Sequence, residues 1–288
     1  MPVLRLPAPA KLNLFLHITG RRVDGYHLLQ TVFQILDYSD EITLERTSDG
    51  NIKRIKGLEN VPQESDLCVR AAMLLKKTTQ SNGGVSYGVN ISIEKRLPIG
   101  GGIGGGSSDA ATVLHGLNAL WECGLTVAEL AELGLQLGAD VPLFVEGQSA
   151  WAEGVGEALT PMILPERWYL VIHPEIFVST EELFADKALT RDNETITIAR
   201  FLESNICGSE LENVFEKIVR KKYPEIDHAI NWLSQFSLAR LTGTGSCIFA
   251  VFDEKKHAQQ VFNKLPEHWQ GFVAKGVNQS PLFSALKF

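Results

Sequence analysis

The sequence predicts an α+β fold, and three observations lead to that prediction. The chain has 288 residues, a length typical of two domains or one large one. Segments with strand periodicity come first, helical segments follow, and strands return near the end, which indicates an α+β sandwich. Pro161 and Pro165 mark a seam between the two sets. We therefore expect one domain over residues 1–162 and a second over 163–288.

The composition excludes several classes of protein. At 44% apolar and 21% charged residues, the chain is typical of a globular protein. It has no apolar run long enough to cross a bilayer and no signal-peptide core at its N-terminus, so we expect a cytoplasmic location. The net charge of −7 disfavours nucleic-acid binding. Four scattered cysteines without a C-x-x-C pair predict neither a zinc site nor a disulfide framework.

The first elements are predicted to be strands. Apolar residues alternate from Leu12 to Ile18, which gives a strand with one core face, while Lys11 and Asn13 lie side by side on its other face. Asp24-Gly25 marks a tight turn. Residues 31–38 and 40–46 continue in β character, and residues 66–77 have helical spacing. A polar turn is expected at 81–84, before another alternating strand at 89–95.

The most informative segment is a run of six glycines between Gly100 and Gly106, broken only by Ile103. Glycine loses more backbone freedom on folding than any other residue, so such a run indicates a close backbone approach or repeated positive φ. It joins the predicted strand to a helix predicted over 110–120. A glycine loop before a helix offers free N–H groups and the positive end of the helix dipole, so it predicts a phosphate site. Ser107 and Ser108 are predicted N-caps of that helix.

Other interpretations of the loop are weaker. It lacks the Gly-Lys-Ser/Thr ending of a Walker A loop. Gly100, Gly102 and Gly105 fit G-x-G-x-x-G, but the acid that a dinucleotide fold needs about 20 residues later has only Glu122 as a candidate, at a helix end. A flexible linker would have polar flanks on both sides. The neighbouring pair Lys95-Arg96 is compatible with an anionic small ligand, although charges at strand ends are usually solvated.

The remaining elements follow in order. Thr126 and Glu129 form a capping box that opens a helix ending at Gly138. Asp140 then lies on a loop constrained by Pro142, before a strand and turn at 150–156. The second set comprises a strand at 168–173, helices near 180–189, 210–223 and 225–236, strands near 240 and at 247–252, a helix at 254–265 and a strand at 272–277.

Three separated motifs together resemble the GHMP small-molecule kinases. They are Pro-Ala-Pro-Ala-Lys-Leu-Asn-Leu at 7–14, the glycine loop at 98–108, and Leu-Thr-Gly-Thr-Gly-Ser at 241–246. Two further segments, Arg-Arg-Val-Asp-Gly-Tyr-His at 21–27 and Gly-Ala-Asp-Val-Pro at 138–142, resemble the branch of that family whose acceptor alcohol carries a cytidine diphosphate. The resemblance extends over nearly the whole chain.

The resemblance implies a two-domain GHMP-kinase-like fold with the active site in the interdomain cleft. Residues 1–162 would bind ATP and carry catalysis, and residues 163–288 would bind the acceptor. The implied reaction is ATP-dependent phosphorylation of the 2-hydroxyl of 4-diphosphocytidyl-2-C-methyl-D-erythritol, in the non-mevalonate route to isoprenoid precursors, with Mg²⁺ accompanying ATP. The implied partners are small molecules, without nucleic acid or membrane, and the chain would be a monomer or a weak homodimer.

The resemblance also assigns roles to individual residues. Asp140 corresponds to the catalytic base and Lys11 to its partner, Tyr26 to the residue that stacks on cytosine, and His27 to the one that contacts the polar edge of the base. Further substrate contacts are implied for Asn13, Thr180, Phe184, Gly243 and Thr244. The ATP loop would comprise Pro98, Ile99, Gly100, Gly101, Gly102, Ile103, Gly104, Gly105, Gly106, Ser107 and Ser108.

The chemistry of these residue types agrees with the implied reaction. An alcohol is a poor nucleophile, so its phosphorylation needs alignment, charge neutralisation and an acceptor for the proton. A carboxylate such as Asp140 can take that proton, and a neighbouring ammonium such as Lys11 would stabilise its charge and orient the hydroxyl. Singly, each residue has an ordinary structural interpretation. Their occurrence with the glycine loop favours catalysis.

Two positions depart from the family pattern. Asp66 stands where an asparagine commonly helps to hold adenine, and a carboxylate cannot donate as an amide does. Asp109 stands where asparagine or aspartate occurs. Two alternatives stay open at this point: a kinase of the same superfamily acting on another alcohol, such as homoserine or a mevalonate-type substrate, and a nucleotide-binding protein without catalysis.

Overall fold

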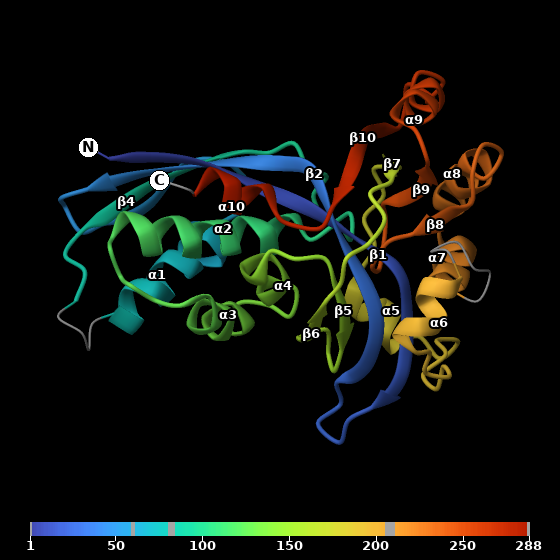
Figure 1. Ribbon diagram of the computed structural model, residues 1–288, viewed down its shortest axis with the longest axis horizontal. Coiled ribbons are helices and arrows are strands. Elements are labelled where there is room, and N and C mark those ends of the chain that lie inside the picture. Colours follow the sequence, from blue (N-terminus) through green and yellow to red (C-terminus); the bar gives the residue numbers. More distant parts are fainter. Residues whose placement is uncertain (1, 59–60, 80–83, 205–210, 287–288) are drawn as a thin grey trace.

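The computed structural model describes residues 2–58, 61–79, 84–204 and 211–286 (Figure 1). The strands are β1 Val3–Arg21, β2 His27–Thr47, β3 Ile52–Lys56, β4 Gly88–Glu94, β5 Ala150–Glu153, β6 Ala158–Pro161, β7 Trp168–His173, β8 Ala239–Leu241, β9 Ile248–Phe252 and β10 Gln270–Val277. The α-helices are α1 Leu67–Thr79, α2 Gly105–Leu120, α3 Val127–Leu135, α4 Val141–Glu146, α5 Thr180–Ala185, α6 Ile198–Glu203, α7 Glu216–Lys222, α8 Pro224–Leu233, α9 Lys255–Phe262 and α10 Pro281–Ala285. A short 3₁₀ helix, Gln63–Ser65, precedes α1.

The predicted α+β class is confirmed, and one long strand organises it. β2 pairs with β1, β4, β5 and β10, and through β10 it is continuous with the C-terminal strands in the order β3-β4-β2-β10-β7-β9-β8. The β3–β4 pair is parallel and the other pairs are antiparallel. The two segments predicted at 31–38 and 40–46 are therefore parts of one strand, and β1 and β2 run through both halves of the molecule.

The face of β1 that the sequence predicts to be polar, which carries Lys11 and Asn13, is buried in the structure. Leu12, Leu14 and Ile18 lie in the core as expected. Lys11 and Asn13, which alternate with them, are 3% and 2% exposed. A second layer, formed by the glycine loop and the C-terminal half, covers this face. The buried polar side chains of β1 therefore need partners inside the protein.

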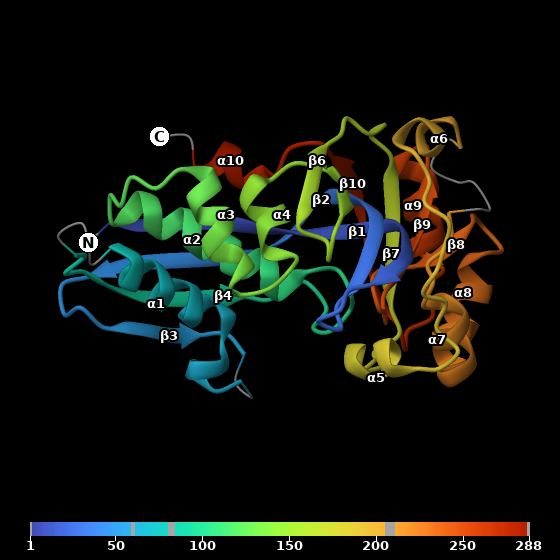
Figure 2. The same cartoon turned by 90° about the horizontal axis from the view of Figure 1, so that it is seen from below.

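The N-terminal half packs its helices against one face of the β1, β2 and β4 strands, as Figures 1 and 2 show. α2 approaches the sheet closely at Gly116, where a β-carbon would lie 2.5 Å from a methyl carbon of Leu44. The same β-carbon would lie 2.7 Å from a methyl carbon of Leu6, so the glycine lets the helix that follows the loop lie directly on β2 and on β1, the strand that carries Lys11. This packing sets the direction in which the N-terminus of α2 points.

The C-terminal half packs α7, α8 and α9 on β7, β8 and β9. A third apolar cluster joins the halves, with Leu12 and Phe15 of β1 against Tyr169 of β7 and Phe272 of β10. The chain finally returns to the first half, where α10 packs on β1. The boundary at residues 162 and 163 stays a prediction.

Some elements differ from the sequence-based expectation. The helix expected at 210–223 begins at Glu216, because the Asn213 side chain accepts a hydrogen bond from Phe215 N and donates to the carbonyls of Leu241 and Gly243, which holds 213 in an irregular conformation. The helix expected at 180–189 ends at Ala185. The sequence did not predict β3, β6, α4, α6 or α10, which are short, and the loop expected at Asp140 is the N-terminus of α4. Residues 81–83 of the expected polar turn, and Glu210, lie outside the described residues.

Candidate active site

The three motifs of the sequence meet in space through backbone and side-chain hydrogen bonds. Lys11 N donates to the carbonyl of Ile103 at 3.0 Å, which joins the first motif to the glycine loop. Cys247, the residue directly after the third motif, donates its N–H to the carbonyl of Gly101 at 3.1 Å, which brings the loop beside that motif. Asn13 N donates to Thr242 Oγ1 at 2.9 Å, which closes the set. The three motifs therefore lie together in the structure, as the resemblance predicted.

The glycine loop needs its glycines for two reasons. Gly100, Gly102 and Gly104 have φ of 72°, 73° and 75°, in the region that disfavours side chains. A β-carbon at Gly102 would lie 2.4 Å from the carbonyl oxygen of Thr242, and one at Gly104 would lie 2.6 Å from the ring of Phe144. The loop is therefore packed between the third motif and α4 and keeps one fixed shape.

The N-terminus of α2 has no side-chain cap. The helix begins at Gly105 with Gly104 as N-cap, so the prediction that Ser107 and Ser108 cap it is wrong. Both serines lie inside the first turn, because the glycine run itself supplies the helix start. The N–H groups at this end are free of side-chain capping, as a phosphate-binding helix N-terminus requires.

Two cavities flank the loop. The larger, of about 1090 Å³, contains every residue assigned to catalysis or substrate binding from the sequence: Lys11, Asn13, Tyr26, His27, Asp140, Thr180, Phe184, Gly243 and Thr244. The smaller, of about 260 Å³, is lined by residues 98–107 and by Leu58, Leu67, Lys95 and Asp109. Gly100, Gly102 and Gly104 line both cavities. Ser108 lines neither cavity, and its hydroxyl is buried.

Lys11 and Asp140 form an ion pair in the larger cavity. Lys11 Nζ lies 3.2 Å from Asp140 Oδ2, and the side chains are 4% and 34% exposed. The same ammonium donates to Asn13 Oδ1 at 2.7 Å and to the carbonyl of Gly102 at 3.2 Å. It also lies 5.1 Å from the centre of the Phe33 ring. The ammonium is thus held behind the carboxylate, which keeps access to the cavity.

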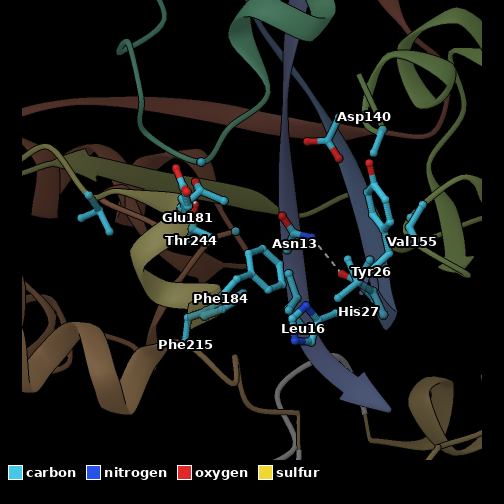
Figure 3. Close-up of a pocket in the computed structure, with 18 of the residues that line it drawn as sticks. Asn13, Leu16, Tyr26, His27, Asp140, Val155, Glu181, Phe184, Phe215 and Thr244 are labelled. Carbon is cyan, nitrogen blue, oxygen red and sulfur yellow. Dashed lines mark hydrogen bonds between the residues drawn. The ribbon is translucent and has the colours of Figure 1, made fainter. Parts of the chain in front are cut away.

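Asp140 is presented by the start of a helix. It is the N-cap residue of α4, where Pro142 stands in the first turn, and its side chain makes no capping hydrogen bond. The ordinary interpretation of an aspartate at this position is a cap. Its carboxylate instead faces Lys11, so the structure leaves it available for chemistry. In Figure 3, Asp140 lies at the upper right of the pocket, and Asn13 and Phe184 lie nearer the centre of the view.

Asn13 is oriented by neighbours on three sides. Its Oδ1 accepts from Lys11, its Nδ2 donates to Thr31 Oγ1 at 3.0 Å, and its backbone N–H donates to Thr242. Thr31 and Thr242 were not predicted as site residues. Thr242 is part of the third motif, so a signal existed, whereas Thr31 lies in β2 with no local pattern to mark it.

The predicted base-recognition residues Tyr26 and His27 both line this cavity, and Figure 3 draws Tyr26 on the side of Asp140 and His27 on the side of Phe184. Tyr26 is 63% exposed and follows the Asp24-Gly25 turn, which is confirmed by the hydrogen bond from Gly25 N to the carbonyl of Arg22 at 3.0 Å. The His27 and Phe184 rings lie 4.9 Å apart between centres, with 31° between their planes. An aromatic surface beside a polar ring suits a heteroaromatic base.

The C-terminal half contributes a polar contact across this cavity. Thr180 begins α5 and Thr244 belongs to the third motif, and their hydroxyl oxygens lie 2.9 Å apart. This bond connects the α5 side of the cavity to the loop that packs on the glycine run. Both residues line the cavity, as the resemblance predicted.

A buried charge cluster supports the base of the loop. Lys95 Nζ lies 2.9 Å from Asp109 Oδ2 and also contacts Asp40, whose Oδ1 accepts from the N–H of Leu97 at 2.8 Å. From the sequence, both side chains of the Lys95-Arg96 pair were expected to be solvated. This prediction is wrong for Lys95, whose side chain is 17% exposed, whereas Arg96 pairs with Glu94 at the surface. Burial raises the pKa of Asp109 to about 7, against the opposing effect of Lys95.

Asp66 has a structural role in this chain. Its Oδ1 accepts from the N–H of Cys68 at 2.8 Å, which caps α1, and its Oδ2 pairs with Arg54. Asp66 is 3% exposed and lines neither cavity. The carboxylate therefore caps the helix and also neutralises a nearly buried guanidinium, which an asparagine could not do.

Comparisons with known proteins agree with this geometry. Residues 66–148 match the family described as GHMP kinases N terminal domain, and residues 188–271 match GHMP kinases C terminal. A 4-diphosphocytidyl-2-C-methyl-D-erythritol kinase of Nitrosococcus oceani is 55% identical over 285 residues, which cover 99% of each chain.

Solved structures agree as well. A crystal structure of 4-(cytidine 5'-diphospho)-2C-methyl-D-erythritol kinase matches with a TM-score of 0.81 and 32% identity, over 95% of this chain and 100% of that one. A homoserine kinase from Cytophaga hutchinsonii shares the fold alone, with a TM-score of 0.67 and 16% identity over 97% and 96% of the two chains. The chain therefore belongs to the GHMP kinases, in the 4-diphosphocytidyl-2-C-methyl-D-erythritol kinase family.

Proposed function

We propose that this chain transfers the γ-phosphoryl group of ATP to the 2-hydroxyl of 4-diphosphocytidyl-2-C-methyl-D-erythritol, with Asp140 as general base and Lys11 as its partner. The observation that carries the proposal is the Lys11–Asp140 pair, which lies in a cavity that shares the glycine loop with a second cavity. This arrangement supports a reaction in which one ligand occupies each cavity and the acceptor oxygen meets the γ-phosphorus beside the loop.

In this mechanism the alcohol oxygen attacks the γ-phosphorus, the bond to the β–γ bridging oxygen breaks, and ADP leaves. The hydroxyl proton passes to a carboxylate oxygen of Asp140. Lys11 keeps the carboxylate in place and is itself fixed by Asn13 and the carbonyl of Gly102. Because Gly102 belongs to the phosphate loop, one ammonium connects the proton acceptor to the nucleotide site.

The loop and the first turn of α2 would hold the ATP phosphates through backbone N–H groups. Mg²⁺ accompanies ATP in this class of reaction and favours phosphate oxygens and water over an all-protein cage. Within the described ranges, no three His, Cys, Asp or Glu side chains gather as a metal site. This supports an ion held mainly by phosphates and water.

The cytidine would lie against Tyr26, which would stack on the base, with His27 at the edge of the base. The wide exposure of Tyr26 supports this role, since a stacking surface must be open before the ligand binds. None of the helices that the structure describes has the length and apolarity to span a membrane. A cytoplasmic location, a monomer or weak homodimer, and a lack of nucleic-acid partners stay predictions.

A substrate panel tests the proposal. ADP release is measured with 4-diphosphocytidyl-2-C-methyl-D-erythritol, homoserine and mevalonate as acceptors. We expect turnover with the first alone. Turnover with homoserine or mevalonate would assign a different acceptor within the same superfamily, and ATP binding without ADP release with any alcohol would leave a nucleotide-binding protein without catalysis.

A further inference from the structure

The ring of His27 is held by a side chain that the reaction chemistry does not use. Arg191 Nε lies 3.2 Å from His27 Nε2 in a hydrogen bond. A guanidinium carries only donors and stays protonated in proteins. His27 Nε2 must therefore be the acceptor. In a neutral imidazole the one ring proton then resides on Nδ1.

The surroundings also keep the His27 ring neutral. Burial lowers the pKa of His27, and the charges of Arg191 and Arg21 lower it further. Protonation of Nε2 would place an N–H against the N–H of Arg191, which is a direct clash of donors. The ring is thus restricted to a single tautomer, with Nδ1–H as its donor.

Arg191 is itself locked in position. Its Nη2 donates to the carbonyls of Phe184 and Asp186 at 2.8 and 2.9 Å, and its Nη1 donates to the carbonyl of Leu189 at 3.0 Å. These three carbonyls surround the C-terminal end of α5. A guanidinium with this many fixed partners cannot turn away from His27 without losing them.

His27 and Phe184 line the cavity, whereas Arg191 does not and lies behind them. Arg191 is therefore not part of the cavity wall and borders it only through His27. No hydrogen bond of Nδ1 occurs among the described residues, so that nitrogen is the one left for a ligand.

We propose that Arg191 is a positioning residue that fixes His27 as the Nδ1–H tautomer and thereby selects cytosine over uracil. This inference rests on the proposed function, in which a cytidine occupies the cavity. The Watson–Crick edge of cytosine offers the acceptors N3 and O2, whereas uracil carries a proton on N3. An Nδ1–H donor pairs with N3 of cytosine and meets another donor in uracil, which leaves both groups unpaired.

Histidine tautomers are read by two-bond ¹⁵N–¹H correlation spectra of the full-length protein without ligand. The His27 signals are assigned by their loss in His27→Gln. We expect a protonated Nδ1 and an unprotonated Nε2 in the wild type, and a shift towards the Nε2–H form in Arg191→Met. A protonated Nε2 in the wild type would overturn the proposal, whatever reaction the protein catalyses.

Selectivity is measured by calorimetric titration of CDP and UDP. We expect the wild type to bind CDP at least about tenfold more tightly than UDP, and we expect Arg191→Met to lose most of this preference. The matched control is Lys222→Met, which removes an ion pair to Asp186 at 2.6 Å and so loosens the same turn without touching His27. The control should keep the ratio.

The two readouts separate a specific role from a structural one. If Arg191→Met only disrupted the C-terminal end of α5, the binding of CDP and the binding of UDP would weaken equally. An unchanged ratio of the two affinities would therefore overturn the proposal. Equal binding of CDP and UDP by the wild type would also overturn it. Failure of the proposed function is a different result, since it would appear as absent turnover in the substrate panel.

Discussion

The ammonium of Lys11 lies 3.2 Å from the carboxylate of Asp140, and only the carboxylate has substantial access to the cavity. The asymmetry matters because the group that must accept a proton needs contact with substrate, whereas its partner needs only a fixed position. β1 buries Lys11 beneath the glycine loop, and the N-terminus of α4 presents Asp140 above it. The pair therefore couples the loop to the acceptor site.

Replacing Asp140 with asparagine should abolish most of the activity. The amide keeps the size of the side chain but cannot accept the hydroxyl proton, so we expect kcat to fall by about 10²–10⁴-fold with a smaller change in KM. Steady-state kinetics measure the change, and a thermal melt controls for folding. Turnover close to that of the wild type would show that another group takes the proton.

Lys11 and Asp140 should act as one unit. Lys11→Met removes the ammonium that holds the carboxylate and also contacts Asn13 and Gly102. We expect its loss of kcat to overlap with that of Asp140→Asn, so that the double variant is far less impaired than the product of the two single effects. Multiplicative effects in the cycle would contradict this coupling.

Tyr26 should contribute to substrate binding and little to stability. Its exposure means that truncation leaves no cavity in the core. Tyr26→Ala should raise the KM for the cytidine substrate by roughly 5–150-fold, since stacking on one base is worth about 1–3 kcal/mol. Tyr26→Phe keeps the ring and should stay within a few-fold of the wild type. An unchanged KM in Tyr26→Ala would show that the base binds elsewhere in the cavity.

The glycine loop should respond differently at two neighbouring positions. Gly104→Ala places a methyl group 2.6 Å from the Phe144 ring at a positive φ, so we expect a loss of about 1–3 kcal/mol in the free energy of unfolding. Gly106 lies in α2 and its nearest neighbour would be 3.5 Å away, so Gly106→Ala should be neutral or up to about 1 kcal/mol stabilising. Urea unfolding compares them, and equal effects would contradict the packing argument.

Asp109 should make stability depend on pH. Two carboxylates, Asp40 and Asp109, share one buried ammonium, and the pKa of Asp109 is raised to about 7, against about 3.9 in an unfolded chain. Between these values the native state holds a proton that the unfolded state has released. The free energy of unfolding therefore falls as pH rises through this window.

Asp109→Asn lacks this titration and serves as the reference. The stability of the wild type relative to the variant should decline by on the order of a few kcal/mol between pH 4 and pH 7.5. Urea unfolding at several pH values measures the difference. A wild type that gains stability with rising pH would show that the Lys95 ion pair outweighs burial.

Local patterns identified most of the elements. Strict alternation predicted β1 and β4, the capping box predicted the start of α3, and the strand at 168–173 has the predicted bounds. Short elements such as β3 and α6 were not predicted, because their stability comes from tertiary contacts rather than from a local pattern. α6 is anchored by a single fully buried residue, Phe201, which packs against Phe15 far away in the chain.

The residue types of the site could be predicted from local sequence, because the glycine loop and the Lys11 and Asp140 motifs are each continuous in the chain. Which polar side chains line the cavities depended on the folded arrangement. Asp66 turned inward to Arg54, and Lys95 pairs with buried carboxylates at the wall of the smaller cavity, while Asp140 kept access to the larger one. The physical reason is that burial and hydrogen-bond partners come from segments distant in sequence, as Arg191 shows by holding His27 from the other half of the chain.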